Sequence, residues 1–263
     1  MLEQGDLRRV HLDFVDALSQ NTLYRAEASR LPSFWRIEAE RLRRLEVEVG
    51  ALVASSSCTT EADRRAIGIP TTKVIPFGVD LPASVPPSAS RPTILFPGNL
   101  GYFANVDAAV WLAEEILPLV RETVPDVRLL AVGARPARQV RALAHTDLIE
   151  VHGDVPSMTP FYGAAWIVAA PLRYGTGLQT KVLEAFAHRR AVVTTTGVAS
   201  RVPGVVAGEH LETADEASTL AKSLVRLLLD QSRRDRLAAA GNAVAQNSSW
   251  HECGRMLERA YQW

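Results

Sequence analysis

The sequence is poor in cysteine and has no net charge. Its two cysteines, Cys58 and Cys253, lie far apart in 263 residues, which excludes a disulfide scaffold and a C-x-x-C site. A reducing cytoplasm is therefore the expected compartment. The 29 Lys and Arg residues balance the 29 Asp and Glu residues, so no global field attracts nucleic acid or an anionic membrane. We expect no nucleic-acid partner.

Long apolar runs and metal-binding patterns are also missing. No run approaches the roughly 20 residues that a membrane-spanning helix needs, and the N-terminus MLEQGDLRRV lacks the apolar core of a signal peptide. The six histidines never fall at the close helical spacing of a zinc site, and no two aspartates form an Asp-x-Asp pair. We therefore predict a protein without a metal ion.

What the sequence does contain is an alternation of β-rich runs and amphipathic stretches, which is typical of parallel βα units. We predict strands at Thr93–Pro97, Val127–Val132, Leu148–His152, Trp166–Ala170 and Ala191–Thr195. We predict helices at Asn105–Thr123, Ala137–Ala144, Met158–Ala164, Lys181–His188, Glu216–Leu229, Arg233–Gln246 and Trp250–Tyr261. The fold class is therefore α/β, with a Rossmann-type, doubly wound parallel sheet in the C-terminal part.

The N-terminal part shows a shorter version of the same pattern. We predict strands at Val10–Val15, Ala51–Ser55 and Lys73–Pro76, with helices at Phe34–Val49 and Glu61–Ile67. The segment Leu81–Pro92 holds four prolines and little that could pack, so we predict a linker there. The predicted organisation is an incomplete α/β domain at 1–80, a linker at 81–92, a Rossmann-like domain at 93–247, and a helix at 248–263 that docks toward the N-terminal domain.

The candidate site lies in the loops that follow the strands, because ligands bind at the carboxyl ends of parallel strands and anions favour helix N-termini. Gly98 and Asn99 follow the strand at 93–97. A second loop contains Gly175, Thr176 and Gly177 and continues into a helix at Thr180. Arg173 precedes this loop and Lys181 lies in the first turn of the helix, so two cations flank a helix N-terminus. This combination suits a diphosphate.

Several alternatives stay open at these positions. Gly98 also fits a tight βα turn, and Glu184 could form a surface ion pair with Lys181 rather than bind a ribose diol. Backbone groups near Val155 could contact a base, although a turn built on Asp154 explains that loop as well. The Gly175 loop matches neither the P-loop nor the G-x-G-x-x-G fingerprint, which disfavours a nicotinamide-dependent oxidoreductase.

The stretch from Thr93 to Tyr261 resembles the nucleotide-binding domain of family 4 type glycosyltransferases of the GT-B fold, also called glycosyl transferases group 1. The matching segments are ILFPGNLGYFANVDA, LLAVG, IEVHGDV, IVAAPLRYGTGLQTKVLEAFA, RAVVTT and SSWHE. Segments within residues 1–80 look like the later portion of the acceptor domain of such an enzyme. FGVD resembles the sequence that often ends that domain, with Phe77 in place of asparagine.

The resemblance implies roles for individual residues. Arg173 and Lys181 would act in catalysis by neutralising the donor diphosphate, and Glu184 would hold the ribose. The other expected donor contacts come from the loops: Gly98, Asn99, Val155, Gly175, Thr176, Gly177 and Thr180. Two of these differ from the family pattern, since Thr176 replaces a glutamate that contacts the donor sugar and Asn99 replaces an arginine.

The resemblance also implies the reaction. We expect a retaining, metal-independent glycosyltransferase without a cofactor, which moves a sugar from a nucleotide-diphosphate sugar to a glycan or lipid-linked acceptor. The alternative is a non-catalytic nucleotide-sugar binding module, or a fragment that needs a partner chain or a second copy to supply missing acceptor-domain elements. Phe34 and Trp35, on an arginine-rich stretch, leave open a peripheral contact with the inner membrane surface. Asp16 is the best remaining acid for the cleft, although a capping role near Ser19 is the competing explanation.

Overall fold

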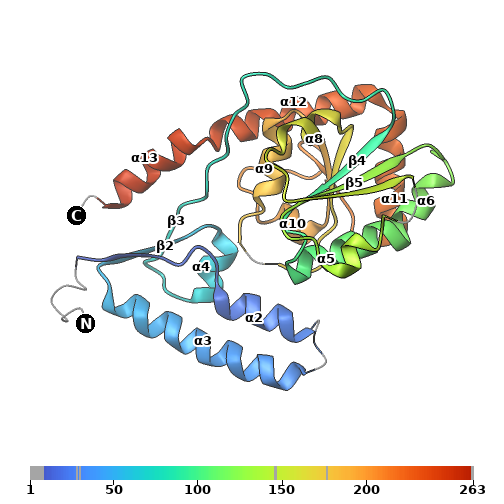
Figure 1. Cartoon of the computed structure of the whole chain (residues 1–263). Helices are drawn as coiled ribbons and strands as arrows, with labels where there is room; N and C mark the ends of the chain where they lie inside the picture. The colour runs from blue at the N-terminus through green and yellow to red at the C-terminus, as the bar shows by residue number, and fades with distance from the viewer. Residues whose placement is uncertain (1–8, 28, 30, 145–146, 176, 262–263) are drawn as a thin grey trace. The chain divides into compact units, whose positions relative to one another are not determined.

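The computed structural model describes residues 9–27, 29, 31–144, 147–175 and 177–261 (Figure 1). The chain forms two compact units. Unit 1 consists of Met1–Gly78, Tyr174–Leu178 and Trp250–Trp263, and unit 2 consists of Val79–Arg173 and Gln179–Ser249. Each unit contains a parallel sheet with helices packed against it, which confirms the predicted α/β class.

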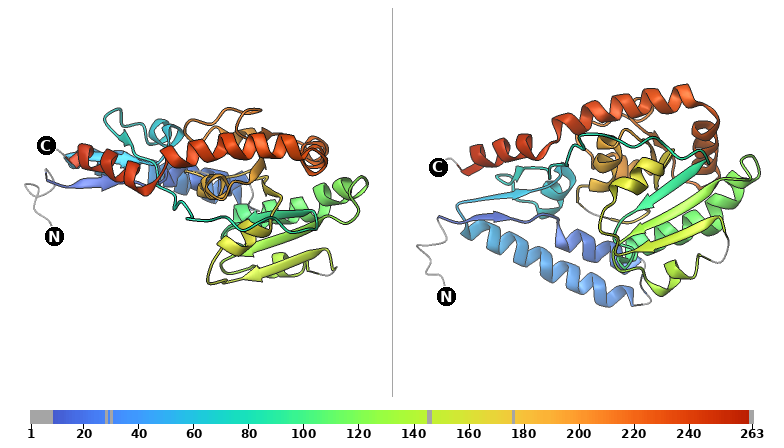
Figure 2. Two further views of the ribbon diagram at one scale, coloured as in Figure 1. Left: turned by 90° about the horizontal axis from the view of Figure 1, so that it is seen from above. Right: turned by 45° about the horizontal axis from the view of Figure 1, so that its top comes forward.

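Unit 2 is built on six parallel strands in the order β6-β5-β4-β7-β8-β9. The strands are β4 (Thr93–Pro97), β5 (Arg128–Gly133), β6 (Ile149–Gly153), β7 (Ile167–Ala170), β8 (Ala191–Thr194) and β9 (Glu212–Thr213). Five of them match the predicted strands to within one residue at each end. The order runs outward from β4 to β6 and then returns to place β7 beside β4, which is the doubly wound arrangement (Figure 2).

The core of unit 2 lies around the two central strands. Every residue of β4 and β7 is buried, as the continuous apolar runs TILF and IVAA require of strands covered on both faces. Among the helices, α11 (Ala217–Leu229) packs against α6 (Leu117–Arg121), whereas α12 (Gln231–Asn247) packs against α9 (Thr180–Ala187). The remaining helices of the unit are α5 (Phe103–Trp111), α7 (Arg138–Arg141), α8 (Thr159–Ala164) and α10 (Thr196–Ala199).

The helix predicted at Asn105–Thr123 is interrupted by the π-helical turn η1 (Leu112–Ile116) between α5 and α6. In this turn the amide of Leu117 donates to the carbonyl of Leu112, five residues earlier. Pro118 follows directly and has no N–H with which to continue an α-helical ladder, so the wider turn costs little there. The apolar periodicity of the sequence could not show this interruption.

Unit 1 contains a smaller parallel sheet in the order β1-β2-β3, with β1 (His11–Asp13), β2 (Ser55–Cys58) and β3 (Lys73–Val74). Its helices are α2 (Leu18–Glu27), α3 (Pro32–Leu52), α4 (Glu61–Ile67) and α13 (Trp250–Tyr261). The predicted strand at Ala51–Ser55 is wrong, because α3 continues to Leu52 and the strand begins at Ser55. The strand SSSC has no apolar pattern. Its serine hydroxyls instead form hydrogen bonds with the side chains of His11 and Thr72.

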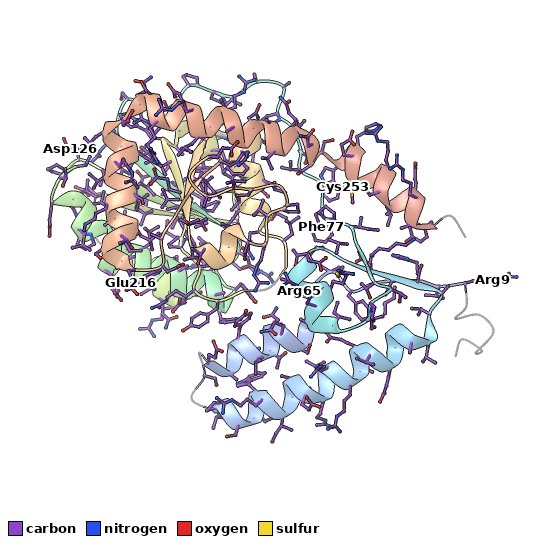
Figure 3. All side chains as sticks on the ribbon, turned by 180° about the vertical axis from the view of Figure 1, so that it is seen from behind. Arg9, Arg65, Phe77, Asp126, Glu216 and Cys253 are labelled. Carbon is purple, nitrogen blue, oxygen red and sulfur yellow. The ribbon has the colours of Figure 1, made fainter. Side chains whose placement is uncertain are left out.

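The C-terminal helix α13 belongs to unit 1 together with residues 9–78. Its Cys253 is buried (Figure 3). The centroid of the Phe77 ring lies 6.3 Å from that of Trp250. Gly78 is pressed against the start of the helix, because a Cβ atom there would lie 2.4 Å from Cα of Trp250. Lys73 Nζ donates to the carbonyl of Ala260 at 3.1 Å. The Gly78 contact explains why FGVD carries a glycine.

The proline-rich segment at 81–92 forms no helix or strand, but it packs against unit 2. The amide of Ala89 donates to the carbonyl of Ala164, and Trp166 Nε1 donates to the carbonyl of Ala89 at 2.6 Å. Arg190 donates to the carbonyl of Pro86 at 2.7 Å. No residue of the segment is buried, so these hydrogen bonds, rather than apolar packing, hold it on the rest of unit 2. The functional domain boundaries given above stay a prediction.

No helix among the described residues combines the length and the apolar character that crossing a membrane requires.

Candidate functional site

The candidate site lies at the carboxyl ends of β4 and β7, where the strand order of unit 2 reverses. Such a reversal leaves a crevice between the loops that follow the two strands, which is where open parallel sheets bind ligands. The loop after β4 contains Gly98 and Asn99. The segment after β7 leads through Arg173 to Lys181 at the start of α9.

Lys181 is a buried cation with an uncharged hydrogen-bond partner. Its side chain is 9% exposed, and its Nζ donates to Oδ1 of Asn105 at 2.6 Å. Nζ also lies 5.5 Å from the centroid of the Phe96 ring. Burial lowers the pKa of Lys181 to about 8, although the charge of Glu184 acts in the opposite direction. The site therefore holds an ammonium group that an anion would stabilise.

Glycines bring the backbone close to this ammonium group. Gly98 has φ +150°, and a Cβ atom on it would lie 3.1 Å from Nζ of Lys181. Gly133, at the end of β5, has φ +154°, and a Cβ atom there would lie 1.6 Å from the carbonyl oxygen of Gly98. A side chain at Gly133 would push the loop away, and the positive φ of both residues favours glycine.

Arg173 forms an ion pair at the surface of unit 2. Its Nε donates to Oδ2 of Asp107 at 3.0 Å and a terminal nitrogen donates to Oδ1 at 2.6 Å. The guanidinium also lies 4.8 Å from the centroid of the Trp111 ring. The side chain is 41% exposed, and that of Asp107 is 26% exposed. Because Asp107 is two residues from Asn105, both predicted cations contact the first half of α5.

Glu184 and Lys181 do not form the surface ion pair that was the alternative for these residues. Lys181 is buried against Asn105, and Oε2 of Glu184 accepts a hydrogen bond of 2.7 Å from the hydroxyl of Tyr162. Glu184 remains partly exposed on α9. The carboxylate is thus held by Tyr162, and the residue as a whole keeps some exposure to solvent.

The first turn of α9 has no side-chain cap on its amides. Its N-cap residue, Gln179, makes no capping hydrogen bond, and Thr180 at the first position is partly exposed. Uncapped amides at a helix N-terminus carry partial positive charge and favour an anion. Lys181 therefore adds a full positive charge to a helix end of the kind that favours anions.

The side chain of Asn99, an expected donor contact, closes its own turn. Oδ1 of Asn99 accepts a hydrogen bond of 3.1 Å from the amide of Gly101, and the backbone oxygen of Asn99 accepts one of 2.9 Å from Nδ2 of Asn105. Asn105 therefore joins the loop after β4 to Lys181. This is an Asx turn with a structural role, and Asn99 has no charge to replace the arginine of the family pattern.

The glycine-rich loop at 174–178 is anchored within unit 1. The amide of Gly177 donates to Oδ1 of Asp63 at 3.4 Å, and that of Leu178 donates to Oγ1 of Thr59 at 3.3 Å. Gly177 has φ +69°, and a Cβ atom there would lie 1.9 Å from Oδ1 of Asp16. Gly175 also has positive φ, at +144°. Thr176 lies outside the described residues.

At Ser19 the hydrogen bonds go to Glu46, although a cap there was the competing explanation for Asp16. The amide of Ser19 donates to Oε1 of Glu46 at 3.1 Å, and the Ser19 hydroxyl donates to Oε2 at 2.5 Å. Glu46 thus takes the capping role near Ser19, and the Asp16 carboxylate lies against Gly177 instead.

The loop after β6 is a turn built on Asp154. This residue has φ +52°, its carboxylate accepts a hydrogen bond of 2.9 Å from the amide of Arg135, and its own amide donates to Gly133. A cavity of about 390 Å³ beside it is lined by Pro136, Arg141, Ala144, Val151, Gly153 and Asp154. Val155 does not line this cavity. The predicted base contact at Val155 would therefore involve only its backbone.

The sequence missed three residues that complete the site: Asn105, Asp107 and Tyr162. All three lie within predicted helices rather than in the loops after the strands, and helical periodicity does not reveal a partner far away in the chain. Among the described residues, no group of three or more His, Cys, Asp or Glu side chains is placed to hold a metal ion.

Comparison with known proteins identifies the family. Residues 91–230, more than half of the chain, match the family described as Glycosyl transferases group 1. The chain is 28% identical over 241 residues to a phosphatidyl-myo-inositol mannosyltransferase of Mycobacterium tuberculosis, which covers 84% of this chain and 61% of that protein. It is 30% identical over 247 residues to a D-inositol 3-phosphate glycosyltransferase of Xylanimonas cellulosilytica, which covers 80% of this chain and 56% of that protein.

Solved structures show the same fold at low sequence identity. The sucrose-phosphate synthase of Thermosynechococcus elongatus superposes with a TM-score of 0.74 at 18% identity, covering 97% of this chain and 67% of that one. HepE of Anabaena, solved with UDP and glucose, gives a TM-score of 0.72 at 14% identity, covering 96% of this chain and 71% of that one. The chain thus spans roughly three fifths of the two sequence relatives named above, and it belongs to the group 1 glycosyl transferases, with an α/β fold of the GT-B type.

Proposed function

We propose that this protein transfers a sugar from a nucleoside-diphosphate sugar to a hydroxyl group of a glycan or lipid-linked acceptor. The observation that carries the proposal is the buried ammonium of Lys181, which is hydrogen-bonded to a neutral amide at the start of an uncapped helix. An uncompensated buried charge costs several kcal/mol, and an anion in contact with it removes much of that cost. A diphosphate between the loops after β4 and β7 would supply this anion.

Arg173 is proposed as the second cation for the diphosphate. Its present partner is Asp107, in a pair with substantial exposure on both sides. Such pairs are worth about 0–1 kcal/mol, whereas charge-assisted, bidentate bonds from arginine to phosphate are stronger and more specific. Exchange of Asp107 for a phosphate oxygen is therefore favourable. In this exchange Arg173 would leave Asp107 and the face of the Trp111 ring.

The remaining donor contacts follow from the site. Glu184, partly exposed on the same helix as Lys181, is proposed to accept hydrogen bonds from the ribose diol. The backbone at Gly98 approaches the phosphates because it carries no side chain. Gly175, Thr176, Gly177 and Thr180 are proposed to contact the phosphate and sugar, and the backbone near Val155 the base.

The chemistry is proposed to be retaining and independent of metal. The acceptor oxygen forms a bond to the anomeric carbon on the face from which the diphosphate departs, while the bond from that carbon to the phosphate oxygen breaks. An oxygen of the leaving diphosphate takes the proton of the acceptor hydroxyl. Lys181, Arg173 and the first amides of α9 stabilise the negative charge that develops on the leaving group.

The names of the relatives support an acceptor that carries a hydroxyl on a lipid-linked or sugar-like ring. One is a phosphatidyl-myo-inositol mannosyltransferase and the other a D-inositol 3-phosphate glycosyltransferase. A lipid-linked acceptor would agree with a peripheral membrane contact through α3, whose Phe34 and Ile37 are both exposed. Arginines and glutamates alternate along the same helix, so we expect such a contact to be weak.

The experiment is a transfer assay with purified protein and UDP-, GDP- and ADP-sugars as donors. Phosphatidylinositol in vesicles, inositol 3-phosphate and oligosaccharides serve as acceptors. We expect one donor to give a glycosylated product by mass spectrometry, together with an equal amount of free nucleoside diphosphate. Binding of the donor without product in any arm would support the alternative of a non-catalytic module. Absence of donor binding would overturn the proposed function.

A further inference from the structure

The carboxylate of Glu184 is held by a tyrosine that has no contact with solvent. Tyr162 is 0% exposed on α8, and its hydroxyl donates to Oε2 of Glu184 at 2.7 Å. Burial, together with the charge of Glu184 and this hydrogen bond, raises the pKa of Tyr162 well above its ordinary value. The hydroxyl therefore keeps its proton throughout the working pH range and acts only as a donor.

A histidine fixes the ring of this tyrosine. His188 stacks on Tyr162 with ring centroids 4.6 Å apart and planes inclined by 17°. Nδ1 of His188 lies 2.8 Å from the carbonyl oxygen of Glu184, so Nδ1 carries the proton. The hydroxyl of Thr159 lies 3.4 Å from Nε2 of the same ring. Glu184 is therefore hydrogen-bonded to Tyr162 through its carboxylate and to His188 through its backbone carbonyl.

The arrangement leaves one oxygen of Glu184 for a ligand. Oε2 accepts from Tyr162, whereas no hydrogen bond from any residue that the structure describes is recorded for Oε1. A partly exposed glutamate without such a bond would sample several rotamers, and ordering it upon binding would cost conformational entropy. A fixed carboxylate removes this cost.

We propose that Tyr162 is a positioning residue: it holds Oε2 of Glu184 so that Oε1 faces the ribose diol of the donor, and it thereby sets the preference for ribonucleotides over nucleotides that lack the diol. This inference rests on the proposed function, because it assigns the ligand of Glu184 to the nucleoside of the donor. The residue added, Tyr162, lies on a different helix from Glu184 and is proposed to contact neither the sugar nor the phosphates of the donor.

The test is calorimetric titration of wild type and Tyr162→Phe with UDP, GDP and ADP and with the 2′,3′-dideoxy forms of these nucleotides. Phenylalanine keeps the buried ring and its stacking on His188, and it removes only the hydroxyl. We expect wild type to prefer the ribonucleotide by about tenfold or more. In Tyr162→Phe the affinity for the ribonucleotide should fall by about three- to tenfold, while the affinity for the dideoxy form stays within twofold.

A double-mutant cycle separates positioning from a general structural effect. Because Tyr162 acts through Glu184, adding Tyr162→Phe to Glu184→Ala, which removes the acceptor of the Tyr162 hydroxyl, should lower the ribonucleotide affinity by less than twofold further. Tyr261→Phe, which removes a hydroxyl in unit 1, is the matched control and should leave both affinities unchanged. Thermal unfolding of each variant checks that the fold persists.

The outcomes distinguish this inference from the proposed function. If wild type binds no nucleoside diphosphate, both are wrong. If wild type binds and discriminates against the dideoxy form, but Tyr162→Phe discriminates equally well or weakens both ligands by the same factor, then only the positioning role is overturned. The positioning role is supported if Tyr162→Phe loses discrimination in the wild-type background but has no further effect in the Glu184→Ala background.

Discussion

At the scale of single residues, the buried charge of Lys181 lowers the free energy of unfolding while it prepares the site for an anion. Its ammonium group is buried and bonded to the neutral amide of Asn105. Burial lowers its pKa from 10.5 to about 8, so the folded protein binds this proton less tightly than the unfolded chain does. The positive charge of Lys181, which would attract an anionic ligand, therefore lowers the stability of the folded protein.

We predict that Lys181→Met stabilises the protein at pH 7, by about 1–3 kcal/mol, because methionine fills similar space without a buried charge. The unfolded lysine binds more protons than the folded one between pH 8 and 10.5, so the stability of wild type should rise with pH in that window. Urea denaturation at pH 7 and pH 10 measures both effects. Equal stability of the two proteins at pH 7 would count against a charged, buried Lys181.

The same pKa predicts a pH dependence of ligand binding. Phosphate oxygens favour the charged form, so the dissociation constant for a nucleoside diphosphate should rise as the pH increases through about 8. Binding at pH 8.5 should take up a proton, which calorimetry detects from the enthalpies in two buffers of different ionisation enthalpy. Lys181→Met should show no such uptake. Proton uptake that persists in Lys181→Met would assign the effect to another group.

At the scale of secondary-structure elements, the short strand β9 depends on one carboxylate. Glu212 is 3% exposed and accepts hydrogen bonds from Arg226 on α11 and Arg233 on α12. Burial alone would raise the pKa of Glu212, but the hydrogen bonds from the two arginines outweigh it and lower the pKa. Glu212 thus connects a two-residue strand, which the sequence did not reveal, to two helices.

We predict that Glu212→Gln lowers the free energy of unfolding by about 1–3 kcal/mol at pH 7, since two arginines lose a buried partner but stay partly exposed. A lowered pKa means that this contribution is present above the ordinary glutamate value and is lost as the pH falls through the folded value. The difference from wild type should therefore shrink in acid. Glu114→Gln, at an exposed position of the same unit, is the control; an equal loss in this variant would contradict the prediction.

The contact of Gly133, at the end of β5, with the loop after β4 leads to a second prediction at this scale. In Gly133→Ala the new Cβ atom would lie 1.6 Å from the carbonyl oxygen of Gly98, so the loop that approaches Lys181 must move. We expect a loss of about 2 kcal/mol or more in stability and a clear loss of nucleotide affinity. Gly197→Ala, where nothing lies within 4 Å of the added atom, should change neither. Unchanged nucleotide affinity in Gly133→Ala would show that the position of this loop does not affect nucleotide binding.

At the scale of the whole molecule, the sequence predicted the architecture of unit 2 better than that of unit 1. Continuous apolar runs identified β4 and β7, because central parallel strands are buried on both faces. In unit 1 the strand β2 consists of three serines and a cysteine, whose stability comes from side-chain hydrogen bonds to neighbours distant in sequence. Pattern reasoning therefore placed that strand too early and missed α2.

The candidate site was predictable only where loops carry its chemistry. Gly98, Arg173 and Lys181 were predicted because they flank strand ends and a helix start, which is where parallel sheets bind anions. Asn105 and Tyr162 were not found, since each acts through a side chain on a helix and its partner is remote in the sequence. Tertiary contacts of this kind are visible only in the folded chain.

The central claim is that a diphosphate binds at Lys181, and calorimetric titration of wild type, Lys181→Met and Lys222→Met tests it most directly. Lys222 is an exposed lysine on α11 and provides the matched loss of charge. We predict that Lys181→Met weakens binding of the preferred nucleoside diphosphate at least tenfold but binding of the corresponding nucleoside less than twofold, while Lys222→Met binds both as wild type does. Equal diphosphate affinities of Lys181→Met and wild type would contradict the account.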